Sequence, residues 1–131
     1  MRVLPLMVAG GLALAASAAQ AHHSFAVYFD PSKSVTITGK VTAFRFTNPH
    51  GMVALAVTDA GGRVTEWRAE TNAPAVLVRR GWTREIIKPG DTITIEGWAS
   101  RDGRPYIRLR RALDANGKLI GSAPFGQTDA G

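Results

Sequence analysis

The chain has 131 residues, no cysteine, and 16 lysines and arginines against 10 aspartates and glutamates, which gives a formal net charge of +6. This length suits one modest domain, and the absence of cysteine excludes disulfide bonds, thiol catalysis and a lipid anchor on a cysteine side chain. The basic excess suits an anionic partner, but the charges are scattered along the chain, and excess charge alone also keeps a small protein soluble.

The first 21 residues predict a cleavable signal peptide. Arg2 precedes an uncharged run rich in Leu, Val, Ala and Gly, and Ala19-Gln20-Ala21 matches a small-residue cleavage site. The apolar run is shorter than the about 20 residues that a membrane-spanning helix needs, so no membrane span is expected. The sequence therefore predicts an exported, periplasmic protein that is cleaved after Ala21, with cleavage after Ala19 as the alternative.

Period-two alternation then predicts the first three strands. The first strand runs from Ser34 to Phe46 and places apolar side chains on one face, until the alternation slips at Ala43-Phe44 and indicates a bulge. Residues 53–58 alternate again, and a turn separates them from a third alternating segment over residues 63–71. These two segments predict an antiparallel hairpin.

The next segment predicts one short helix and two further strands. Asn72 is expected to cap a helix that continues to Arg80, and Gly81 can end it. Alternation over residues 92–99 and 106–113 predicts the fourth and fifth strands.

Three strands, a helix and two strands, with a bent first strand, is the element order of a small five-stranded antiparallel OB-like barrel, an all-β fold with one short helix. We assign the barrel to residues 22–120 and expect residues 121–131, which lack periodicity, to form a disordered tail. An open antiparallel sandwich of the same strands is the alternative architecture.

The three histidines of the chain predict a metal site. His22 and His23 stand at the expected new N-terminus, and His50 stands in a turn over residues 48–51. Cleavage after Ala21 would give His22 a free α-amino group, which can chelate a metal ion together with Nδ1 of its ring. His50 or His23 would add a third nitrogen and complete a histidine brace. Because nitrogen-rich tetragonal sites favour copper(II), the leading hypothesis is a periplasmic copper carrier or sequestering protein.

Two alternatives to this brace stay open. Cleavage after Ala19 would make His22 the third residue, where the amine, two backbone amides and the imidazole can surround copper(II) or nickel(II) in a plane. The other alternative is a metal-free binding or assembly module, in which Trp98, Arg108 and Arg110 grip an anionic envelope ligand or protein.

Other patterns in the sequence predict structural roles. No Ser-centred elbow, phosphate-cradling Gly loop or His-Glu zinc helix appears, so binding is favoured over catalysis, and export argues against a nucleic-acid partner. The alternating Phe25, Val27 and Phe29 are expected to anchor the N-terminal segment. Several charged residues are interpreted as cross-strand pairs on a solvated face, with Glu66, Glu70 and Glu96 as partners of Arg68 and Arg108.

Three motifs carry a family resemblance over nearly the whole mature chain. They are His22-His23-Ser24-Phe25-Ala26, Thr47-Asn48-Pro49-His50, and Arg80-Gly81-Trp82-Thr83-Arg84 running on to Lys88-Pro89-Gly90-Asp91. Together they resemble an exported bacterial family of unknown function, domain-of-unknown-function family 6152. The resemblance implies export and a small β-barrel, and it implies no activity and no catalytic residue.

Overall fold

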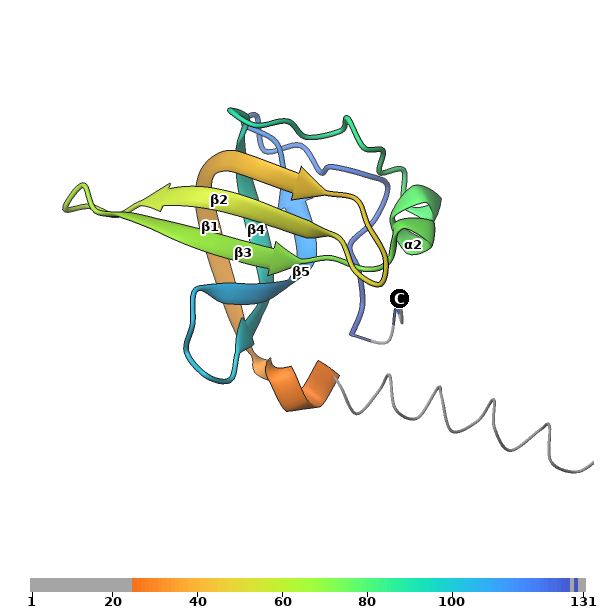
Figure 1. The fold of residues 1–131 in the computed structure, drawn as a ribbon, viewed down its shortest axis with the longest axis horizontal. Coiled ribbons are helices and arrows are strands. Elements are labelled where there is room, and N and C mark those ends of the chain that lie inside the picture. The colour runs from red at the N-terminus through yellow and green to blue at the C-terminus, as the bar shows by residue number, and fades with distance from the viewer. Residues whose placement is uncertain (1–24, 128, 130–131) are drawn as a thin grey trace, which may run out of the picture.

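The computed structural model describes residues 25–127 and 129, and its centre is a closed barrel of five strands (Figure 1). One short helix, α2, stands between the third and fourth strands, and no helix in the described ranges is long and apolar enough to cross a membrane. The elements in chain order are β1 (Phe29–Arg45), β2 (Met52–Thr58), β3 (Val64–Glu70), α2 (Pro74–Arg79), β4 (Thr92–Ser100) and β5 (Tyr106–Leu113). This confirms the predicted all-β, OB-like fold class over the open sandwich.

The expectation of a purely antiparallel barrel needs one correction. The strands close in the order β1-β2-β3-β5-β4, and four of the five neighbouring pairs are antiparallel, but β3 and β5 pair in parallel. The reason is parity, because strand directions cannot alternate all the way round a ring with an odd number of strands. The parallel pair places the ends of β3 and β5 side by side, and the candidate site lies there.

The first strand is longer than predicted and serves two neighbours. It begins at Phe29 rather than Ser34, and it pairs with β4 over its first part and with β2 over its last part. The register shifts between Val41 and Ala43, close to the predicted position at Ala43-Phe44. A bulge bends the strand, which lets it follow the curved wall of the barrel.

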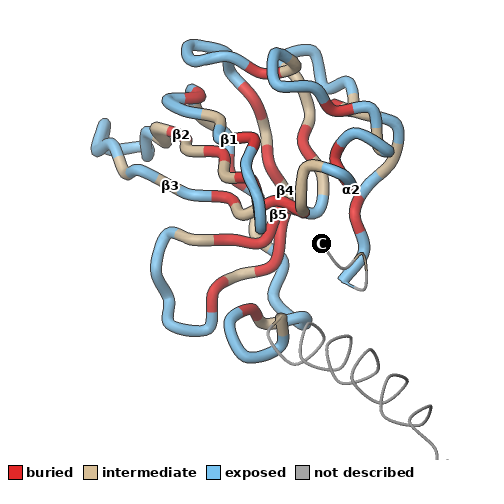
Figure 2. The backbone as a smooth tube through the Cα atoms, turned by 45° about the vertical axis from the view of Figure 1, so that its right-hand side comes forward, coloured by how far each residue is buried: buried red, intermediate tan, exposed pale blue. Residues whose placement is uncertain are grey.

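Buried side chains line the inside of the barrel and continue under α2 (Figure 2). Leu55 of β2, Ile95 of β4 and Leu109 of β5 are fully buried, as their place in the period-two pattern predicts. Trp82 follows the helix and is only 1% exposed. The core therefore extends from the barrel interior to the helix end.

Helix α2 ends as the sequence predicts but begins differently. Gly81 has a positive φ of 78°, and the Trp82 N–H donates to the Leu77 carbonyl at 2.9 Å, which is the glycine-terminated helix end expected here. At the start, Ala73 is the N-cap residue and no side chain caps the helix. The prediction that Asn72 caps α2 is wrong, because its side-chain amide donates instead to the Asp129 carbonyl.

The expected disordered tail packs against the domain over its described part. Phe125 is 2% exposed, and its ring centroid lies 6.0 Å from that of Trp82. The prediction of disorder over residues 121–131 is therefore wrong for residues 121–127. It failed because a single aromatic residue in a Gly- and Ser-rich segment has no periodicity, yet it can fill an apolar site beside Trp82.

We expect hydrogen exchange to report this docking. The Ser122 N–H donates to the Arg80 carbonyl at 2.8 Å, and the Phe125 N–H donates to the Arg110 carbonyl at 2.7 Å. Both amides should exchange more slowly than the amide of the exposed Gln127, measured residue by residue by NMR. Equally fast exchange at all three positions would contradict the docked tail.

Candidate functional site

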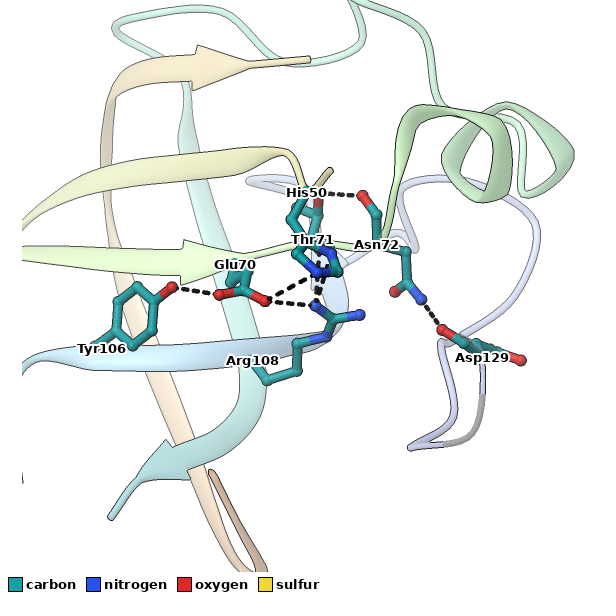
Figure 3. A network of polar contacts seen from close by, with 7 residues as sticks. All are labelled: His50, Glu70, Thr71, Asn72, Tyr106, Arg108 and Asp129. Carbon is teal, nitrogen blue, oxygen red and sulfur yellow. Dashed lines mark hydrogen bonds and ion pairs between the residues drawn. The ribbon is translucent and has the colours of Figure 1, made fainter. Parts of the chain in front are cut away.

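A cluster of polar side chains lies where β3 and β5 pair, next to the turn between β1 and β2 (Figure 3). The register sets Glu70, the last residue of β3, opposite Arg108 of β5. Tyr106 comes two residues before Arg108 and therefore lies on the same face of β5. His50 reaches the cluster from the β1–β2 turn. We call Glu70, Arg108, Tyr106 and His50 the polar cluster.

Arg108 is the centre of the polar cluster and is only 8% exposed. Its Nη1 donates to Glu70 Oε1 at 2.8 Å, to the Thr71 carbonyl at 2.9 Å, and to His50 Nδ1 at 3.4 Å. Burial lowers the pKa of the guanidinium from its ordinary value, while the Glu70 carboxylate opposes this effect. An arginine remains charged in a protein, so Arg108 brings a positive charge into the cluster and Glu70 balances it.

Tyr106 fixes the other oxygen of Glu70. Its hydroxyl donates a hydrogen bond to Glu70 Oε2. Burial, assisted by the neighbouring carboxylate, raises the pKa of the Tyr106 hydroxyl well above its usual range, so the phenol keeps its proton and remains a donor. The Glu70 carboxylate is thus held from both sides, with one lone pair of Oε1 still facing His50.

His50 lies with its ring between Arg108 and Glu70. Its Nε2 stands 3.8 Å from Glu70 Oε1, and 38% of its side-chain surface is exposed. Because arginine can only donate, the contact at Nδ1 requires a lone pair there, and the neutral ring then carries its proton on Nε2. The exposed side of His50 is open to a ligand from solvent.

The N-terminal segment is anchored beside this cluster by aromatic contacts. Residues 25–28 are helical, so Phe25 and Phe29 share one face, while Val27 is 62% exposed. The Phe25 ring lies 5.7 Å from that of Phe29 and meets Trp98 edge-on at 5.4 Å. The expected anchoring is confirmed for the two phenylalanines. Val27 takes no part, because the spacing is helical rather than alternating.

Phe29 joins this aromatic group to the polar cluster. Its ring stacks on Tyr106 with centroids 5.5 Å apart, and Tyr106 in turn donates to Glu70. A continuous chain of contacts therefore runs from Phe25 to the carboxylate that faces His50. His22 and His23, the other predicted metal ligands, lie outside the described residues, as does the predicted signal peptide.

The residues predicted to grip an anionic ligand are not brought together as an open surface. Trp98 is 8% exposed and covered by Phe25, so the prediction of an accessible stacking surface is wrong. Arg108 is buried rather than on a solvated face, and only Arg110 is exposed. Of the expected charged pairs, Glu66 with Arg68 and Glu70 with Arg108 are confirmed, whereas Glu96 pairs with Arg111.

Sequence reasoning missed that Glu70 and Tyr106 belong beside His50. The signal was indirect, because Glu70 ends a strand and His50 stands in the turn that precedes its neighbouring strand. Within the described part of the chain, no group of three or more His, Asp or Glu side chains stands ready to hold a metal ion. His50 and Glu70 form a pair, and any further ligand has to come from elsewhere.

Comparison with known proteins identifies a family. A family model described as a family of unknown function, DUF6152, matches residues 9–107. No curated protein matches the chain.

Solved structures give similarities at low identity. One is the enzyme TiaS in its complex with tRNA and ATP, with 15% identity, a TM-score of 0.47, and coverage of 66% of this chain and 19% of that chain. Another is the mitochondrial single-stranded DNA binding protein Rim1 from S. cerevisiae, with 11% identity, a TM-score of 0.48, and coverage of 70% and 97%. The chain thus spans only about a fifth of the length of TiaS. The family match covers most of the chain and confirms the resemblance of its motifs, and the protein belongs to the family DUF6152.

Proposed function

We propose that the protein is exported to the periplasm and binds copper(II) through the α-amino group and ring of His22 together with His50, as a carrier or sequestering protein. One observation supports the proposal most, namely that Phe25 is anchored on Phe29 and Trp98 at the side of the barrel that carries the polar cluster. A terminal metal site needs such an anchor, because a loose N-terminus would lose much of its binding free energy to ordering.

The covalent reach of the chain is compatible with this site. His22 precedes Phe25 by three residues, which span at most about 10 Å when extended. The His22 side chain adds further reach toward His50. Cleavage after Ala21 is part of the proposal, because the α-amino group exists only after that cut.

The polar cluster suits a cation better than an anion. Arg108 is the buried positive charge, but its Nη1 already donates to Glu70 and Thr71. The metal-free alternative, in which Trp98, Arg108 and Arg110 bind an anionic envelope partner, has less support because two of these three side chains are buried. The exposed imidazole next to a carboxylate favours the copper hypothesis instead.

A copper titration tests the proposal. Exported protein is purified, its N-terminus is checked by mass spectrometry, and copper(II) binding is followed by electron paramagnetic resonance and a competition assay. We expect a nitrogen-rich copper signal. His22→Ala, His50→Ala and a variant with an extra N-terminal Met should each bind at least about 100-fold more weakly, since loss of a direct ligand exceeds the 10–100-fold cost of losing an outer-shell partner.

The variants also separate the alternatives. His23→Ala identifies whether His23 supplies a nitrogen to the same ion. A mature protein that begins at Gln20 and keeps its copper signal in His50→Ala would point to the planar site. An absent signal, or one unchanged in both His22→Ala and His50→Ala, would refute the proposed function.

A further inference from the structure

We propose that Glu70 supplies the oxygen ligand of the copper site, and that Arg108 is the internal cation which copper has to displace from His50. This inference rests on the proposed function and adds the identity of a fourth ligand and the source of competition. It comes from the geometry of the polar cluster, where one guanidinium nitrogen contacts both groups that would face the metal.

The distance between the two ligand atoms fits a single ion. His50 Nε2 and Glu70 Oε1 are 3.8 Å apart, and metal ions of this size bind imidazole nitrogen and carboxylate oxygen at about 2.0–2.2 Å. An ion between them can therefore contact both atoms without movement of either residue. With the amine and ring of His22, the set would comprise three nitrogens and one oxygen, which copper(II) accepts in a tetragonal arrangement.

Glu70 is prepared for this role by its other partners. Tyr106 donates to Oε2 and Arg108 donates to Oε1, so the carboxylate has one orientation before a metal arrives. Carboxylates that bind metals are commonly held by such outer hydrogen bonds, because a fixed ligand loses little entropy on binding. Tyr106 is thus a positioning residue for Glu70.

Arg108 opposes copper through the imidazole as well as through its charge. Its donation to His50 Nδ1 leaves the ring proton on Nε2, the nitrogen that would bind the ion. Copper on Nε2 requires the proton to stand on Nδ1, where it would point at the guanidinium, a donor facing a donor. The Arg108–His50 contact must therefore break when copper binds. The metal-free site is closed by a built-in competitor.

The inference predicts opposite signs for two substitutions. Glu70→Gln removes the negative charge but keeps an oxygen acceptor for Tyr106 or Arg108, and copper(II) should bind about 10- to 100-fold more weakly. Arg108→Met removes the competing cation, and copper(II) should bind about tenfold more tightly, even though the metal-free variant melts at a lower temperature. Arg108→Lys keeps the charge and should bind copper less tightly than Arg108→Met.

Copper affinity and the paramagnetic resonance spectrum are measured for each folded variant. The matched controls are Glu66→Gln and Arg110→Met, which alter exposed residues on the same strands and should leave copper affinity unchanged. Circular dichroism verifies that each variant is folded before titration. Should Arg108→Met fail to fold, the comparison between Arg108→Lys and Glu70→Gln still decides, since only the latter is expected to bind more weakly than wild type.

Two results would overturn this inference. One is a Glu70→Gln protein with wild-type copper affinity and an unchanged spectrum, and the other is weaker binding in folded Arg108→Met. Either result leaves the proposed function standing if wild-type binding still depends on His22 and His50. A wild-type protein that binds no copper refutes both.

Discussion

Replacement of Trp82 by alanine is expected to lower the free energy of unfolding by about 3–5 kcal/mol. Trp82 is 1% exposed, and its ring lies 5.9 Å from Phe44 of β1 and 6.0 Å from Phe125 of the tail, measured between centroids. One side chain thus connects the barrel, the end of α2 and the tail. The cavity left by alanine would remove contacts to all three, and urea denaturation measures the loss.

Trp82→Phe is the matched control for this prediction. Trp82 Nε1 is buried and has no hydrogen-bond partner among the described residues, so a phenylalanine there breaks no such bond. Phenylalanine also keeps an aromatic ring between Phe44 and Phe125. We expect Trp82→Phe to be clearly more stable than Trp82→Ala. If the two variants were equally destabilised, the ring packing would not be the source of the effect.

The fold was largely predictable because its strands obey local rules. Val53 and Leu55 alternate with less buried neighbours, and Gly81 ends α2 with the expected positive φ. Even the parallel β3–β5 pair follows from the number of strands in a closed ring. The tail was not predictable in this way, because Phe125 docks through tertiary contacts that leave no periodic signal.

The polar cluster was harder to predict because a bulge changes which side chains of β5 are buried. The register of β4 and β5 shifts between Glu96 and Gly97, so that Gly97 pairs with Leu109 while Glu96 pairs with Arg111. Simple alternation therefore fails at Arg108, which is buried between Ile107 and Leu109. The pairing of Glu70 with an arginine could be predicted, but its approach to His50 depends on this register.

Gly97 is the residue whose substitution should disturb both the fold and the polar cluster. A Cβ atom at Gly97 would lie 2.2 Å from the Arg108 carbonyl oxygen and 3.0 Å from its carbonyl carbon. These are backbone atoms, so no side chain can rotate out of the way and the two strands must separate. Gly97→Ala is expected to cost at least about 3 kcal/mol of unfolding free energy, at the upper end of the range for overpacking.

The strand that has to move in Gly97→Ala carries Arg108, so the same change should also weaken the Arg108–Glu70 ion pair. Gly61→Ala is the control, because a Cβ there meets only Asp59 Oδ1 at 3.4 Å, and its stability should stay within about 0.5 kcal/mol of wild type. Urea denaturation compares the two variants. Since the approach of β4 to β5 sets the position of Arg108 against Glu70, a Gly97→Ala protein as stable as Gly61→Ala would contradict the strand spacing from which the polar cluster is built.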